Sequence, residues 1–118
     1  MSQTIKVAPP NSLLFISGPD EDQPIDFSIF KTIRWNSTCV AISCLTFMDG
    51  ETEVTLGNSE EVAPGWPPAF DDFVIARGSM VISTSERTTL LDMPVTGDRT
   101  RVKIWIDEEP DKVIVGIG

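Results

Sequence analysis

Residues 99–107 read RTRVKIWID and have the clearest two-residue period in the chain. Strict alternation over this length predicts a β-strand with one buried and one solvated face. The predicted buried face consists of Thr100, Val102, Ile104 and Ile106, and the predicted solvated face consists of Arg99, Arg101, Lys103 and Trp105.

The solvated face of this strand concentrates three of the nine Lys and Arg residues in a chain with eighteen carboxylates. Such a strip is either a contact surface or the charge partner of an acidic neighbouring strand. We favour cross-strand pairing with Glu51 and Glu53, because opposite charges across neighbouring strands stabilise a sheet. In the alternative, Arg101, Lys103 and Trp105 bind an anionic ligand on which the indole stacks, so all three are candidate binding residues.

The rest of the chain resembles this stretch in being short-stranded and rich in β-branched residues. Eight glycines and nine prolines interrupt it, and no long helical repeat is present. This spacing predicts an all-β protein, an antiparallel β-sandwich of about nine short strands. Besides 99–107, the predicted strands cover residues 4–8, 12–17, 25–30, 39–47, 51–56, 73–76, 80–84, 88–95 and 112–117.

Turn residues give further expectations about the connections. Residues 48–50 contain Asp-Gly and predict a hairpin, and residues 77–79 predict a second hairpin. Pro94 indicates a sheet edge or a bend. We expect a long irregular loop over residues 57–69 and a helical turn within residues 27–35.

Length and composition favour one domain over residues 1–118. The apolar runs reach only four or five residues, and the N-terminus has no apolar signal-peptide core, so we expect a cytoplasmic protein. Cys39 and Cys44 fall on one predicted strand with their side chains on opposite faces. We therefore expect two reduced, buried thiols rather than a disulfide.

The net charge of −9 argues against nucleic acid or an anionic membrane as a partner, because phosphate binding depends on clustered cations. The negative charge is compatible with a basic protein partner. Alternatively, it only keeps the protein soluble. The prediction leaves homo-oligomerisation open.

Histidine is absent from the chain. Its absence removes Ser-His-Asp and Cys-His nucleophiles, imidazole metal ligands and the commonest acid–base group near neutral pH. We therefore predict that the protein is not an enzyme and uses no cofactor and no metal.

Two loops hold the remaining candidate binding residues. The acidic segment Asp20, Glu21 and Asp22 lacks the ligand spacing of an EF-hand, so a solvated turn is favoured over a calcium site. Trp66 lies in a proline-rich loop, where it either covers one end of the sandwich or serves as an exposed binding anchor.

Several segments occur in a characteristic order: Asp-Phe-Ser-Ile-Phe at residues 26–30, Trp35, Val-Ala-Ile-Ser at residues 40–43, Leu-Asp-Met-Pro at residues 91–94, Gly-Asp at residues 97–98 and the strand ending in Trp105. This order resembles that of the competence protein J family, small acidic β proteins that inhibit a DNA-entry nuclease. The similarity covers residues 13–105, although the tyrosines of the family have no counterpart. The resemblance implies an antiparallel β-sandwich and a binding role. It does not identify any individual functional residue in this chain.

Three hypotheses about function follow. The first is a non-catalytic β-sandwich that binds another protein, as an inhibitor or immunity-type partner of a basic protein such as a nuclease. Its acidic segments at residues 20–22, 60–61 and 107–111 would then mimic the phosphate charge that the target normally meets. The alternatives are a structural module of a phage or secretion assembly, and a lectin-like sandwich that binds ligands through Trp66 and Trp105.

Overall fold

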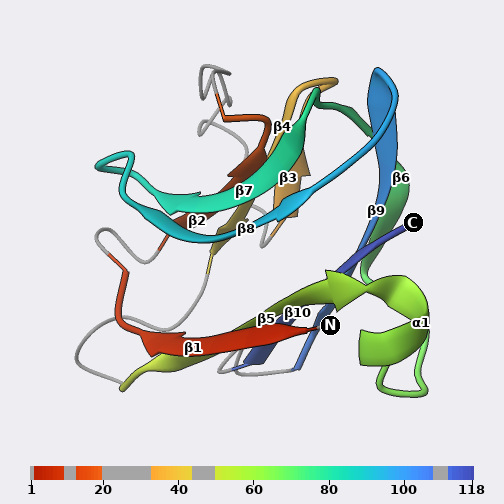
Figure 1. Ribbon diagram of the computed structural model, residues 1–118. Helices are drawn as coiled ribbons and strands as arrows, with labels where there is room; N and C mark the ends of the chain where they lie inside the picture. Colours follow the sequence, from red (N-terminus) through yellow and green to blue (C-terminus); the bar gives the residue numbers. More distant parts are fainter. Residues whose placement is uncertain (1, 10–12, 20–32, 44–49, 108–111) are drawn as a thin grey trace.

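The computed structural model describes residues 2–9, 13–19, 33–43, 50–107 and 112–118. Within these residues the chain forms ten strands and one short helix (Figure 1). The elements are β1 Gln3–Val7, β2 Leu13–Ser17, β3 Ile33–Trp35, β4 Cys39–Ser43, β5 Thr52–Asn58, α1 Ser59–Val62, β6 Phe70–Ile75, β7 Ser79–Thr84, β8 Thr89–Pro94, β9 Arg99–Ile106 and β10 Lys112–Ile117. No helix in the described residues has the length and apolar character needed to cross a bilayer.

The strands form two five-stranded sheets. The first sheet has the order β1-β5-β10-β9-β6, and the second has the order β3-β4-β2-β7-β8. All neighbouring strands are antiparallel except β5 and β10, which run parallel. The predicted all-β sandwich is confirmed, with one parallel pair that the alternation patterns did not indicate.

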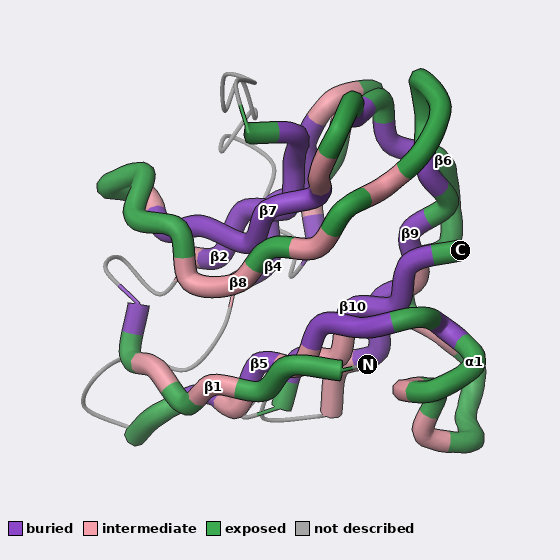
Figure 2. The backbone as a smooth tube through the Cα atoms, viewed as in Figure 1, coloured by how far each residue is buried: buried purple, intermediate pink, exposed green. Residues whose placement is uncertain are grey.

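The core lies between the facing sides of the two sheets (Figure 2). Alternate residues of each strand enter it, because successive side chains of a strand point to opposite faces. On β5, for example, Thr52, Val54 and Leu56 point inward and are fully buried. The largest buried side chains come from both sheets: Leu14, Ile16, Ile42, Leu56, Met80, Ile82 and Ile104.

The predicted hairpin at residues 77–79 is wrong, because β6 and β7 belong to different sheets and this turn connects the two layers of the sandwich. β4 and β5 also belong to different sheets, while residues 44–49, which include most of the other predicted hairpin, lie outside the described residues. The glycines do have the positive φ expected of tight turns, +115° at Gly50 and +82° at Gly78. Turn chemistry places the reversal but does not select the strand with which the next segment pairs.

A hairpin that was not predicted joins β3 to β4. The side-chain oxygen of Asn36 accepts hydrogen bonds from the backbone N–H groups of Thr38 and Cys39, both at 2.9 Å. This Asx turn orients the reversal. The helical turn expected within residues 27–35 is wrong over Ile33–Trp35, which is β3, while residues 27–32 and the predicted strand 25–30 lie outside the described residues.

The expected loop at residues 57–69 is only partly irregular. β5 continues to Asn58, and Ser59–Val62 forms α1 before the proline-rich segment. Pro94 ends β8, an edge strand of the second sheet, as its residue type predicts. Cys39 is buried on β4, whereas Cys44 lies outside the described residues.

Candidate interaction site

The cationic strip of β9 lies on the outer face of the first sheet. Arg99 and Arg101 are exposed and Lys103 is half-buried, as the alternation predicts. Trp105 differs, because only 3% of its surface is exposed. The strip is therefore solvated at its start and covered at its end.

Trp105 is covered by α1 and the proline-rich segment. Its indole Nε1 donates a hydrogen bond of 2.8 Å to the backbone carbonyl of Trp66. Gly116 on β10 permits the close fit, since a Cβ there would lie 2.8 Å from Trp105 Cζ3 and 2.7 Å from Ser59 Oγ. The expectation that Trp105 lies on a solvated face is wrong, because residues distant in sequence fold over it.

The cations of the strip have an acidic neighbour, but it is neither Glu51 nor Glu53. β9 lies between β10 and β6, so β5 is not adjacent to it. Arg101 instead binds Asp71 of β6, with Nε–Oδ1 and Nη2–Oδ2 distances of 2.8 Å each. Glu53 lies opposite Lys6 on β1 and Lys112 on β10.

The Arg101–Asp71 pair changes the acidity of both groups. The hydrogen bonds from Arg101 lower the pKa of Asp71 and outweigh the opposing effect of desolvation, and the positive charges of Arg101 and Lys103 lower the pKa further. The same hydrogen bonds raise the pKa of Arg101. Asp71 is thus held ionised, which suits a charge partner rather than a general acid.

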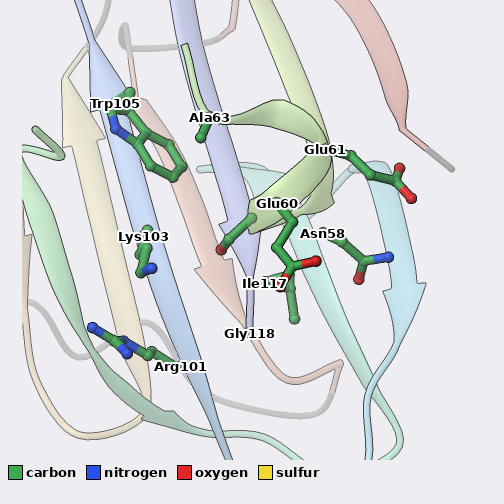
Figure 3. A pocket seen from close by; sticks show the side chains of 10 residues that line it. Asn58, Glu60, Glu61, Ala63, Arg101, Lys103, Trp105, Ile117 and Gly118 are labelled. Atoms are coloured by element: carbon green, nitrogen blue, oxygen red, sulfur yellow. The ribbon is translucent and has the colours of Figure 1, made fainter. Parts of the chain in front are cut away.

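A groove of about 670 Å³ is lined by the strip on one side and by α1 on the other (Figure 3). Arg101, Lys103 and Trp105 follow one another along β9, and Glu60 faces them from α1. Both signs of charge line the groove, so it has no single preference for an anion or a cation. Its lining residues are Asn58, Ser59, Glu60, Glu61, Ala63, Arg101, Lys103, Trp105, Ile117 and Gly118.

The other predicted binding residues are not assembled into one site. Trp66 is 49% exposed, yet it shares no open platform with Trp105, whose ring is buried. The lectin-like use of this pair is therefore not supported. Asp20, Glu21 and Asp22 lie outside the described residues. Among the residues that are described, no group of three or more His, Cys, Asp or Glu side chains could hold a metal ion.

Sequence reasoning missed three exposed apolar side chains, Trp35 at 53%, Phe73 at 48% and Ile75 at 43% exposure. Phe73 and Ile75 lie on the outer face of β6, and Trp35 lies at the end of β3. The signal in the sequence is weak, because the run Phe73-Val74-Ile75-Ala76 is continuously apolar and does not separate inner from outer residues.

The guanidinium of Arg99 stacks on Phe73, 4.6 Å from its ring centroid. The rings of Trp35 and Phe70 meet edge to face at 5.2 Å. The backbone N–H of Ile75 donates to the carbonyl of Ser37 at 2.8 Å, and this bond links β6 to the β3–β4 turn. The ring of Trp35 therefore packs on the inward-facing side of β6, whereas Phe73 and Ile75 lie on the outer face of that strand.

This arrangement of strands occurs in a solved structure. The fold is similar to that of ComJ from Bacillus subtilis. ComJ is described as an inhibitor of the DNA-degrading activity of NucA, and the match has a TM-score of 0.68 over 99% of this chain and 96% of ComJ. The sequence identity is 9%, so the likeness to ComJ is one of fold. No family model and no curated protein matches the chain.

Proposed function

We propose that this protein is a non-catalytic β-sandwich that binds another protein and inhibits it, with a basic nuclease as the target. The observation that carries the proposal is the fold shared with ComJ along nearly the full length of both chains. Because fold alone does not determine function, the proposal also rests on the charge and the chemistry of this chain.

The charge supports a basic target. A nuclease that binds DNA presents cations to phosphate groups, and a protein with a net charge of −9 carries the sign of that substrate. Complementary charge accelerates association and disfavours partners of the same sign.

The Arg101–Asp71 pair fits a binding protein better than an enzyme. The carboxylate of Asp71 is engaged by Arg101, and its pKa is lowered rather than raised. General acids in enzymes usually need a pKa raised towards the working pH.

The test is a nuclease inhibition assay. Purified protein is titrated into NucA, and into the basic nuclease encoded nearest to this chain in its genome, with plasmid degradation as the readout. We expect inhibition of at least one nuclease that is complete near one molar equivalent and weakens as salt increases. An unrelated protein of equal negative charge serves as the control for non-specific electrostatic competition. Full nuclease activity at a tenfold excess in low salt, with both nucleases, would contradict the proposal.

A further inference from the structure

We propose that a pocket at the start of β9 binds a small organic anion, a carboxylate or phosphate group carried on an apolar body. The pocket lies where the chain passes from β8 of the second sheet to β9 of the first (Figure 1), has a volume of about 430 Å³ and is here called the arginine pocket. Its lining includes Phe73 of β6, Met93 and Pro94 of β8, and Arg99 and Arg101 of β9. Pockets of this size that combine apolar walls with a few polar groups are typical of small-ligand sites.

The charged residues that line the arginine pocket have one sign. Among the described residues, two arginines line it and no Asp or Glu does. Arg101 is engaged by both carboxylate oxygens of Asp71, whereas Arg99 forms no ion pair with any described residue. Asp98, next to Arg99 in the sequence, pairs with Arg77 at 3.5 Å instead. Arg99 is therefore a cation at the pocket that no described carboxylate side chain neutralises.

Phe73 holds the guanidinium of Arg99 in place. The guanidinium carbon lies 4.6 Å from the ring centroid, which is a cation–π contact. Stacking occupies the face of the guanidinium and leaves its edge, where the N–H groups bind the oxygens of a carboxylate or phosphate. A cation held in this way loses less conformational freedom when an anion binds, which increases the affinity.

Two further polar residues line the arginine pocket. Asn58 is exposed at the end of β5 and does not cap α1 through its side chain. Thr100 is 7% exposed, and its enclosed Oγ1 has no hydrogen-bond partner among the described residues. A buried polar atom without a partner is uncommon in native proteins and often marks the position of a bound group. The amide of Asn58 and the hydroxyl of Thr100 thus add hydrogen-bonding capacity beside Arg99.

Neighbouring charges do not alter the preference for an anion. The groove beside α1 shares Arg101 with the arginine pocket, but Glu60 and Glu61 line that groove and not the pocket. Arg34 lies on β3 of the second sheet, and its Nη2 donates to Ser43 Oγ at 3.3 Å. It does not line the arginine pocket.

A small anion fits the molecule better than a long one. Nucleic acid binding depends on several clustered cations, whereas the arginine pocket offers one that lacks a carboxylate partner. The net charge of −9 repels a polyanion along its whole length. Salt screens exposed charges beyond about 10 Å, so a small monoanion in the pocket mainly experiences the charges that line it.

The experiment titrates the protein with benzoate and with phenyl phosphate and follows the NMR resonances of Arg99 and Met93. Both probes combine an anionic group with an apolar ring. At least one of them should shift these resonances, with a dissociation constant at least tenfold below those of benzyl alcohol and benzylamine, which have the ring without the negative charge. The probe that binds more tightly identifies the anionic group.

Single substitutions locate the site. Arg99→Gln should raise the dissociation constant of the tighter probe at least tenfold. Phe73→Leu keeps an apolar side chain but removes the stacking, so it should raise the constant severalfold. Lys6→Gln is the matched control, because it changes the net charge equally at an exposed position of β1, at the opposite edge of the first sheet from β6. It should change the constant less than twofold, and melting temperatures verify that each variant folds.

Three results would overturn the inference. They are the absence of shifts at Arg99 and Met93 with both anions, equal affinity for benzyl alcohol, and an Arg99→Gln variant that binds as tightly as the unaltered protein. Each of them leaves the proposed inhibition of a nuclease standing, because the titration contains no nuclease. Conversely, a negative nuclease assay leaves the anion site standing.

Discussion

The guanidinium of Arg101 on β9 engages both carboxylate oxygens of Asp71 on β6, with two hydrogen bonds of 2.8 Å. The two residues are diagonal neighbours, because Asp71 lies directly opposite Lys103, and Arg101 lies opposite Phe73. Two parallel hydrogen bonds of this kind are stronger and more directional than a single contact. The cation at the centre of the strip thus joins the edge strand β6 to the rest of the first sheet.

The first prediction concerns the acidity of Asp71. Its carboxyl should titrate below the ordinary value of 3.8, and Arg101→Gln should bring the pKa back towards that value. Because the folded-state pKa lies below the unfolded one, the pair stabilises the fold above the unfolded value and loses this effect as the pH falls through the folded pKa. Carboxyl carbon NMR between about pH 2 and 7 measures the shift. Arg77→Gln, which alters a different surface pair, is the control and should leave the titration of Asp71 unchanged.

The second prediction is that Trp105 and Trp66, both candidate binding residues from the sequence, differ in their contribution to the free energy of unfolding. Trp105→Ala should lower the free energy of unfolding by about 3–5 kcal/mol, since a buried indole is lost. Trp66→Ala should cost less than about 0.5 kcal/mol, because its side chain is half exposed and its backbone carbonyl, which accepts the bond from Trp105, is retained. Urea unfolding measures both, and equal losses would contradict the assignment of Trp105 as the structural member.

Trp105 and Arg101 show which features of β9 could be predicted from the sequence alone and which could not. Alternation in residues 99–107 predicted the inner and outer faces of β9 correctly from local geometry. It could not predict that Trp105 is covered, because the covering carbonyl lies 39 residues away and belongs to a segment with no regular period. The partner of Arg101 was missed for the same reason. Strand order determines which carboxylate is adjacent, and the parallel β5–β10 pair brings β10, not β5, beside β9.

The third prediction concerns the contact between β10 and α1. Gly116→Ala should destabilise the protein by about 1–3 kcal/mol, because its Cβ would lie 2.7 Å from Ser59 Oγ, 2.8 Å from Trp105 Cζ3 and 2.9 Å from Ser59 Cα. Displacement of Trp105 towards water should also shift the tryptophan emission to longer wavelength. Gly78→Ala is the control, since its φ of +82° strains the backbone while no atom lies within 4 Å of the new Cβ. It should lower stability without changing the emission.

The fourth prediction concerns a buried hydroxyl on the inner face of β9. Thr100 is 7% exposed, and its Oγ1 has no hydrogen-bond partner among the described residues. A buried hydroxyl without a partner is destabilising, so Thr100→Val, which keeps the shape and removes the polar atom, should raise the free energy of unfolding by about 1 kcal/mol. For a domain of this size, that corresponds to a rise of about 4 °C in Tm.

Thr84 provides the matched comparison for Thr100, because it is equally buried but its hydroxyl has partners. Its Oγ1 accepts hydrogen bonds from the backbone N–H groups of Glu86 at 3.2 Å and Thr88 at 3.3 Å. Thr84→Val leaves these donors without an acceptor and should lower Tm, so the two substitutions are expected to move stability in opposite directions. Calorimetry on both variants measures the difference. A fall in Tm for Thr100→Val would mean that its hydroxyl has a partner after all, and that the inner face of β9 is more polar than the packing of Thr100 indicates.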